Sequence, residues 1–222
     1  SDETIGTAQV VDTPYIIDTR EYTLTGLGAS AVQVAAGGEL ELQGTVVATK
    51  GIGVQVESGG SLRITGTTYI EGSSYALDVV SGADVRLSTG KYFGKKAAIR
   101  TAGDFASLLS PNCAFFDESG SPILLSDLAA VRTVVVGQCA GHSKDYDAHV
   151  TGATSHTWRC LFCGTEQSEQ CDFTFDTEGR GVCACGSVLT IVVDESDLTG
   201  LVYDGTIQAE DVKITVALAD GS

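Results

Sequence analysis

A degenerate repeat opens with Ala31-Val-Gln-Val-Ala-Ala-Gly37-Gly-Glu-Leu-Glu-Leu-Gln-Gly44-Thr45. The second copy reads Gly53-Val-Gln-Val-Glu-Ser-Gly59-Gly-Ser-Leu-Arg-Ile-Thr-Gly66-Thr67, and the third reads Ala76-Leu-Asp-Val-Val-Ser-Gly82-Ala-Asp-Val-Arg-Leu-Ser88. A fourth begins with Ala97-Ala-Ile-Arg-Thr-Ala-Gly103. The anchor glycine of each copy therefore recurs after 22, 23 and 21 residues. A fixed period of this length is typical of a solenoid built from stacked coils.

Apolar and polar residues alternate within each copy, which predicts strands with one buried face. The predicted inward columns are Leu40/Leu62/Val85, Leu42/Ile64/Leu87, Val32/Val54/Leu77 and Val34/Val56/Val79. The positions between them predict two outward ladders, namely Glu41/Arg63/Arg86 and Gln33/Gln55/Asp78/Arg100.

A third short strand is expected in each coil, at Val46-Val-Ala48, Thr68-Tyr-Ile70 and Lys91-Tyr-Phe93, ending at Gly51, Gly72 and Gly94. Tyr69 and Tyr92 are the middle residues of two of these strands, with two alternatives for their side chains: exposure at a surface, or packing in the coil core or a turn. Three strands per coil predict an all-β fold, a short right-handed parallel β-helix of about four coils, similar to the pectin lyase-like solenoids. The alternative is a β-sandwich of short hairpins, but hairpins do not require a constant glycine period.

Four segments are expected along the chain. Residues 1–30 form an N-terminal cap or first strand, because a solenoid end exposes its core. Residues 31–136 form the β-helix, closed by a helical turn from Phe105, a hairpin around Asp117-Glu-Ser-Gly120, and one more strand from Val131 to Val136. Residues 137–186 form a Cys/His-rich module. Residues 187–222 form a β segment, either a partial domain or strands that pair with the Cys/His-rich module.

The composition excludes several classes of partner. The chain of 222 residues carries a formal net charge of −16, which repels nucleic acid and anionic membranes. No apolar run approaches the roughly 18–20 residues needed to span a bilayer, so membrane insertion is not expected. The first residues lack the pattern of a signal peptide. We therefore expect a monomeric mature fragment of a larger protein.

Six of the seven cysteines and all three histidines lie between residues 139 and 185. Without His149 they provide eight ligands, the complement of two closed tetrahedral zinc sites. One sorting of these ligands gives a set made of Cys139, His142, Cys160 and Cys163, and a second set made of His156, Cys171, Cys183 and Cys185. An interleaved arrangement would use the same residues. The Cys-x2-Cys-Gly sequence at 160–164 is typical of a zinc knuckle, whose glycine permits the tight turn.

Two structural zinc ions are expected because a polar segment of this size buries too little apolar surface to fold alone. Three disulfides are the alternative in an oxidising environment, but they leave His142 and His156 without a role. A catalytic zinc is not expected, since it needs an open coordination position. We interpret Cys113 as a buried free thiol and His149 as a solvated loop residue.

The order of these segments resembles regions of large surface and secreted proteins from Gram-positive gut and mucosal bacteria. The resemblance rests on the coils, on Leu108-Leu109 followed by Phe115-Phe-Asp-Glu-Ser-Gly-Ser-Pro-Ile123, and on the Cys/His pattern. Cys171 departs from it, because a histidine is common there, although cysteine also ligates zinc. Leu201-Val-Tyr-Asp-Gly205 is similar to the start of the Tyr-Asp-Gly Ig-like modules that follow in such proteins.

The resemblance implies a non-catalytic module at the bacterial cell surface or outside the cell. Such a module serves in adhesion to a host glycan, glycoprotein or immunoglobulin, or as a rigid spacer. Tyr69 and Tyr92 are the candidate contact residues. The alternative is a carbohydrate-active β-helix, a polysaccharide lyase or glycoside hydrolase. That chemistry needs converging carboxylates, whereas Asp78 lies in a ladder between Gln55 and Arg100.

Overall fold

The computed structural model describes residues 2–146, 155–193 and 214–218. Two compact units are present. One comprises Ser1–Ser143 with Cys160–Thr165, and the other comprises Lys144–Arg159 with Glu166–Ser222. Within the described ranges, no helix is long and apolar enough to cross a membrane.

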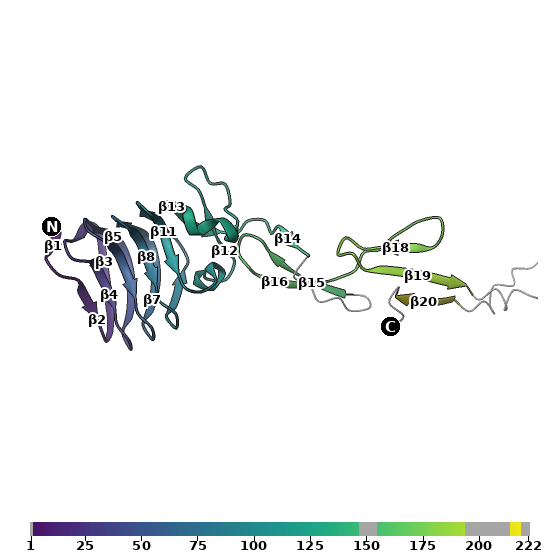
Figure 1. The fold of residues 1–222 in the computed structure, drawn as a ribbon, viewed down its shortest axis with the longest axis horizontal. Helices are drawn as coiled ribbons and strands as arrows, with labels where there is room; N and C mark the ends of the chain where they lie inside the picture. The colour runs from purple at the N-terminus through teal and green to yellow at the C-terminus, as the bar shows by residue number, and fades with distance from the viewer. Residues whose placement is uncertain (1, 147–154, 194–213, 219–222) are drawn as a thin grey trace, which may run out of the picture. The chain divides into compact units, whose positions relative to one another are not determined.

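The first unit is a parallel β-solenoid of about four turns (Figure 1). Its eight-stranded sheet runs in the order β1 (Glu3–Ile5), β3 (Pro14–Gly26), β5 (Glu39–Ala48), β7 (Ser61–Gly72), β10 (Gly90–Gly94), β13 (Thr133–Gln138) and β12 (Cys113–Phe116), with β9 (Asp84–Leu87) paired to β7. Its five-stranded sheet runs in the order β11 (Ala97–Thr101), β8 (Tyr75–Val79), β6 (Ile52–Val56), β4 (Ser30–Val34) and β2 (Gln9–Val11).

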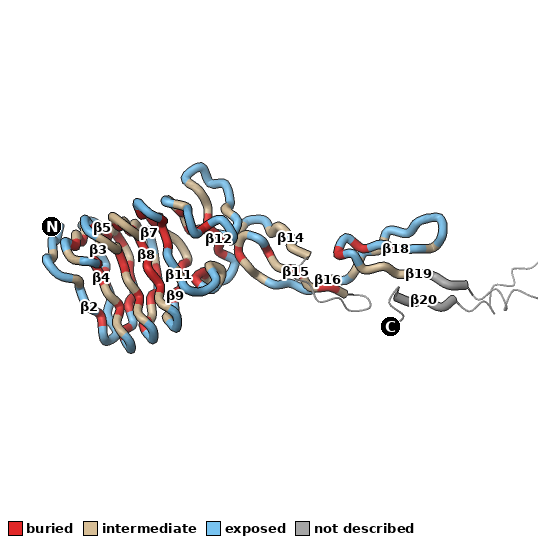
Figure 2. Tube along the Cα trace, viewed as in Figure 1, coloured by how far each residue is buried: buried red, intermediate tan, exposed pale blue. Residues whose placement is uncertain are grey.

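The register of these strands confirms the predicted columns of side chains. Leu40 pairs with Leu62, which pairs with Val85, and all three are buried. On the other sheet Val32, Val54 and Leu77 form an equally buried column. The two apolar faces meet inside the coils and make one continuous core (Figure 2). The outward ladders are confirmed as well, for Glu41 pairs with Arg63 and Gln55 with Asp78.

The anchor glycines form the corner turns between the two sheets, and these turns stack on one another from coil to coil. Gly37, Gly59 and Gly82 all have φ near +80°, a backbone region that other residues rarely adopt. The amide of Gly37 donates to the carbonyl of Gly59 at 3.0 Å, and that of Gly59 donates to Gly82 at 2.9 Å. The period of about 22 residues is therefore the length of chain between equivalent corners.

The predicted third strand differs from the observed one in two respects. First, β5 and β7 are continuous through the second and third predicted strands, and bend at a register shift between Leu42 and Gly44. Separate strands occur only in the next coil, as β9 and β10. Second, Gly72 pairs with Ala48, so Gly51 is not its equivalent.

Of the two alternatives for Tyr92, packing in the coil core is the observed one. Lys91 pairs with Tyr69, and Tyr92 pairs with Ile70 in the inward column of Leu24, Val46 and Ile70. The predicted alignment of the two tyrosines was one residue out of register, and a shift of one residue moves a side chain to the opposite face. Tyr92 is 0% exposed, and its hydroxyl donates to the carbonyl of Thr89 at 2.8 Å. It fills the core and cannot contact a ligand there.

Residues 105–138 close one end of the solenoid, as expected. The helical turn is the 3-10 helix η1 (Phe105–Leu108), and a second one, η2 (Leu125–Ala130), follows the hairpin. The hairpin follows β12 and is closed by an isolated antiparallel bridge between Phe116, the last residue of β12, and Pro122. Strand β13 then runs antiparallel to both β10 and β12, which ends the parallel stacking.

At the other end, the residues interpreted as a cap or first strand contain β1, β2 and β3. Strands β2 and β3 pair in parallel with β4 and β5, so both sheets continue into this segment. The pairing of β3 with β5 has a register shift of its own, between Thr19 and Thr23.

The Cys/His-rich region forms two small antiparallel sheets. One contains β14 (Lys144–Asp145), β15 (Ser155–Cys160) and β16 (Glu166–Gln170). The other contains β17 (Thr174–Phe175), β18 (Arg180–Val182), β19 (Val188–Val193) and β20 (Ile214–Leu218). Pairing of β19 with β18 confirms that the C-terminal segment adds strands to this region. His149 and the Leu201–Gly205 stretch lie outside the described residues.

Truncation of a core side chain tests the solenoid. Leu62→Ala removes a fully buried side chain from the middle of a column, and we expect it to lower the free energy of unfolding by about 2–5 kcal/mol. Ile16→Ala is the matched control, because Ile16 is 69% exposed, and its effect should stay within about 0.5 kcal/mol. Urea unfolding followed by circular dichroism measures both. Equal losses would contradict the assigned faces.

The outward ladder ends in an ion pair that allows a second test. Both guanidinium contacts from Arg100 to Asp78 measure 2.6 Å, and Asp78 is buried. Arg100→Ala leaves that carboxylate without its cation, so we expect a loss of about 1–3 kcal/mol. Adding Asp78→Asn removes the stranded charge and should recover most of the loss in the same urea experiment. A double variant no more stable than Arg100→Ala would contradict this account.

Candidate metal centres

The first cluster lies in the solenoid unit. Cys139 directly follows β13, and its amide donates to the carbonyl of Asn112 at 2.8 Å. His142 lies in the loop that follows. Cys160 and Cys163 belong to the short segment Cys160–Thr165, which the contacts assign to the same unit. The amide of Leu161 donates to the carbonyl of Ser143 at 3.0 Å, and the amide of Leu125 donates to that of Leu161 at 3.3 Å. These bonds attach the segment to the closing end of the solenoid.

The four ligand atoms of this cluster are arranged around one point. They are the three sulfurs and a ring nitrogen, and all lie within 4.8 Å of one another. Nδ1 of His142 is 3.7 Å from Sγ of Cys139 and 3.4 Å from Sγ of Cys163. Neighbouring ligands of a tetrahedral zinc ion lie roughly 3.5–3.8 Å apart, given the usual bond lengths to sulfur and nitrogen. The spacing therefore fits a tetrahedral metal.

The turn from Cys160 to Thr165 has the hydrogen bonds of a zinc knuckle. The amide of Cys160 donates to Thr165 at 3.0 Å, and that of Gly164, with φ of +68°, donates to Cys160 at 2.9 Å. Burial disfavours the Cys160 thiolate, but hydrogen bonds from the backbone of Cys163 and Phe162 outweigh it and lower the pKa of Cys160 to about 6. A thiol that ionises near neutral pH is prepared to bind a metal.

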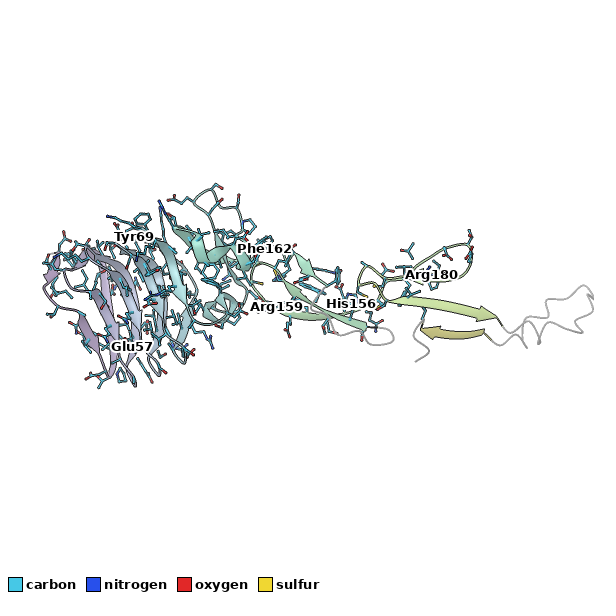
Figure 3. The ribbon with its side chains drawn as sticks, in the orientation of Figure 1. Glu57, Tyr69, His156, Arg159, Phe162 and Arg180 are labelled. Carbon is cyan, nitrogen blue, oxygen red and sulfur yellow. The ribbon has the colours of Figure 1, made fainter. Side chains whose placement is uncertain are left out.

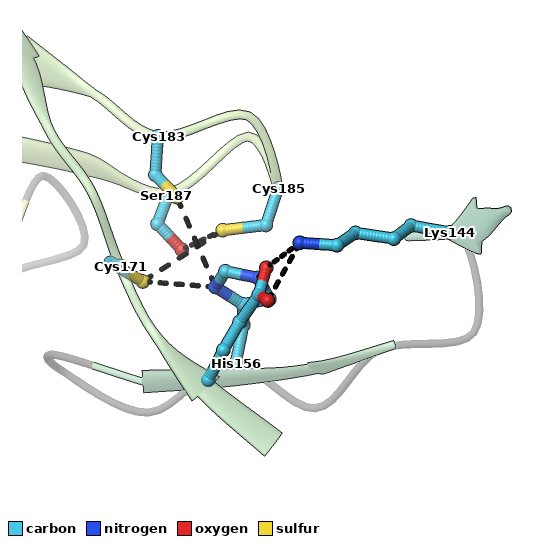
Figure 4. A network of polar contacts seen from close by, with 7 residues as sticks. Lys144, His156, Cys171, Cys183, Cys185 and Ser187 are labelled. Atoms are coloured by element: carbon cyan, nitrogen blue, oxygen red, sulfur yellow. Dashed lines mark hydrogen bonds and ion pairs between the residues drawn. The ribbon is translucent and has the colours of Figure 1, made fainter. Parts of the chain in front are cut away.

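The second cluster lies in the other unit (Figure 4). His156 is on β15, Cys171 follows β16, and Cys183 and Cys185 follow β18. Nδ1 of His156 is 3.3 Å from Sγ of Cys171 and 3.9 Å from Sγ of Cys183. The sulfurs of Cys171 and Cys185 are 3.9 Å apart, far beyond the roughly 2.05 Å of a disulfide bond. All seven cysteines are free thiols in this structure.

The two knuckles share one hydrogen-bond pattern although their spacing differs. In the second, the amide of Cys183 donates to Ser187 at 2.9 Å and that of Gly186 donates to Cys183 at 2.9 Å. In each knuckle a hydroxyl lies 3.2 Å from the last sulfur, Thr165 in the first and Ser187 in the second. Burial alone would raise the pKa of the Cys185 thiol, but hydrogen bonds with the side chain and backbone of Ser187 outweigh it and lower the pKa to about 7. The Cys-x-Cys turn is thus a shortened form of the Cys-x2-Cys turn.

A carboxylate orients His156 in the second cluster. Oε1 of Glu169 accepts from Nε2 of His156 at 2.9 Å, which directs Nδ1 toward the three sulfurs. The hydrogen bonds from Lys144, at 2.6 Å to both oxygens, are the main reason that the pKa of Glu169 falls to about 2, with His156 and Trp158 contributing. His156 is 3% exposed and contacts the ring of Tyr146 at 5.3 Å between centroids. Ring orientation is therefore fixed from several sides.

The structure brings the eight predicted ligands together in two sets of four, which match the first of the two sortings and not the interleaved one. Cys113 is buried outside both sets, with its sulfur 3.5 Å from the carbonyl of Ser88, and burial raises its pKa. Tyr69 is only half-buried on the solenoid and its hydroxyl donates to Glu71 at 2.8 Å (Figure 3). Burial and this carboxylate raise the pKa of Tyr69 to about 12.

Sequence reasoning missed the residues around the ligands. Thr165 and Ser187 had a signal, because both sites contain Cys-Gly followed by a hydroxyl residue. Glu169 and Lys144 had none. Glu169 meets His156 through the pairing of β15 with β16, in which the two residues lie directly opposite one another, and Lys144 reaches Glu169 from β14. No protein-family model, curated protein or solved structure matches the chain.

A conservative change at Glu169 tests the role of the carboxylate. Glu169→Gln keeps the size of the side chain but weakens the bond that orients His156, and we expect metal affinity at the second cluster to fall about 10–100-fold. Competition with a chromophoric chelator measures the affinity of each cluster. Glu166→Gln, on the same strand, is the matched control and should change neither value. Equal affinities for wild type and Glu169→Gln would contradict the orienting role.

Proposed function

We propose that each cluster holds one structural zinc ion. Three thiolates and one imidazole form a ligand set that suits zinc, and they fill all four tetrahedral positions with protein atoms. Cys160, Cys163, His156, Cys183 and Cys185 are buried, whereas Cys139, His142 and Cys171 are half-buried. Such a closed site stabilises a fold and leaves no coordination position for a substrate.

Native mass spectrometry tests the two ions. We expect two zinc ions per chain, which a chelator removes, leaving free thiols. Cys163→Ser should lose the ion of the first cluster and Cys183→Ser that of the second, each leaving one ion bound. Cys113→Ala is the control and should keep both. A metal-free chain that is lighter by about six protons would indicate three disulfides and would contradict the zinc assignment.

We infer that the whole chain is a non-catalytic module of a bacterial cell-surface or secreted protein. The observation that carries this proposal is one Cys/His cluster in the solenoid unit and a second one in the other unit. The first cluster holds the segment Cys160–Thr165 against the closing end of the coils. The second connects strands β15, β16 and β18, which have few apolar residues to bury. Metal ions thus replace a core where the chain has none. The result is a rigid support suited to adhesion or to spacing another domain.

The charged groups on the described coils support the same proposal. Asp78 pairs with Arg100 and Glu118 pairs with Lys91 at 2.6 Å. Glu71 accepts from Tyr69. Hydrolysis of a glycosidic bond needs two carboxylates that face the same bond. These three carboxylates already bind a cation or a phenol hydroxyl, which favours a non-catalytic surface over a catalytic cleft.

Incubation with polysaccharides, mucin and serum proteins separates the proposed roles. A binding module retains a glycan, mucin or immunoglobulin saturably and releases no product. A spacer retains none of them. New reducing ends or unsaturated sugars, in amounts proportional to the concentration of the chain, would contradict the non-catalytic assignment and identify a carbohydrate-active enzyme.

A further inference from the structure

The first coil differs from the others at two of the positions that point inward, whereas Val11, Ile17 and Leu24 continue the aliphatic columns and are buried. Gln9 continues the column of Val32, Val54 and Leu77, and Tyr15 continues the column of Leu40, Leu62 and Val85. A polar and an amphipathic side chain thus replace aliphatic ones where the core reaches the end of the coils. Gln9 is exposed and Tyr15 is 52% exposed. At these two positions the described end of the core is therefore open to solvent.

This layer surrounds a hollow of about 270 Å³. Ile17 and Leu24, both buried, form its apolar floor. Tyr22 belongs to the irregular part of β3, is 49% exposed and stands on the rim. The polar groups around it come from Glu3, Gln9, Asp18, Thr19 and Thr23. The lining of this hollow is thus more polar than apolar, which suits a ligand that carries many hydroxyl groups.

A second hollow, of about 550 Å³, adjoins the first on the outer face of the eight-stranded sheet. Tyr15 and Ile16 line both hollows and so separate them. The second is lined further by Glu39, Glu41 and Arg63 from the next two coils. Two adjoining hollows on either side of one aromatic ring would accommodate a ligand with several linked units.

We propose that these two hollows bind a neutral oligosaccharide across Tyr15 and Tyr22. Sugar rings present apolar C–H faces that pack on aromatic rings, and hydroxyls that bond to carboxylates, amides and guanidinium groups. The hollows offer both kinds of group. Carboxylates outnumber cations around them and the chain carries a net charge of −16, so acidic sugars are repelled. The proposal rests on the adhesive form of the proposed function and adds the ligand class and the site.

A titration tests the site with defined probes. Chitotetraose, cellotetraose, maltotetraose and lacto-N-tetraose serve as the neutral probes, and tetragalacturonate serves as the acidic one. Isothermal calorimetry on the zinc-loaded chain should detect saturable binding of at least one neutral probe and none of the acidic probe. Tyr15→Ala and Tyr22→Ala should each weaken that binding roughly tenfold or more, the loss typical of an aromatic contact that dominates an interface. Tyr15→Phe should retain most of it, since the ring remains.

Phe175→Ala is the matched control, because Phe175 is another exposed aromatic residue, at 45%, and lies in the other unit. It should bind as wild type does, and every variant should retain two zinc ions. Binding that persists in Tyr15→Ala and Tyr22→Ala would overturn the site but leave the adhesive function standing. Failure of all neutral probes would overturn the ligand class, whereas mucin or serum binding tests the function separately. Self-association that Tyr15→Ala abolishes would assign this end to another chain and overturn the proposal.

Discussion

Stacking of coils in strict register is the constraint on which the solenoid depends. Each coil is connected to the next by main-chain hydrogen bonds of parallel strands, and every inward side chain packs on its counterpart one coil away. Corners must fall at the same place in each coil, which the glycines with positive φ allow. A shift of one residue would exchange core and surface. The chain therefore needs only a short repeated pattern, and tolerates changes such as Asp84 for Glu39, wherever the side chain faces outward.

The Cys/His region follows a different physical principle. Its small antiparallel sheets bury little apolar surface, so tetrahedral ligand sets take the place of a core. The knuckle at Cys160 to Thr165 also closes a solenoid end, where unpaired coils would expose apolar layers. We infer that the first metal stabilises the solenoid as well as the knuckle. The second cluster has additional support from Glu169 and Lys144, which hold its histidine from behind.

These features together favour a durable support over an enzyme. The solenoid has a closing end, where the first Cys/His cluster lies, and an opposite end at which Gln9 and Tyr15 are exposed. The proposed ligand site at that opposite end lies mostly on β1, β2 and β3, which are already hydrogen-bonded into the two sheets. Such preorganisation lowers the entropy lost on binding.

The sequence by itself determined the parallel coils, their inward columns and the eight ligands, because each follows from a local pattern. Alternation assigns strand faces, glycine spacing assigns corners, and Cys-Gly turns identify knuckles. Only the tertiary structure decided that Tyr92 is core and Tyr69 is not, because that depends on a register difference of one residue between β7 and β10. It also placed Glu169 behind His156 and exposed Tyr15 at the end of a core column. These three outcomes depend on which strands lie side by side, and no local pattern in the chain specifies that.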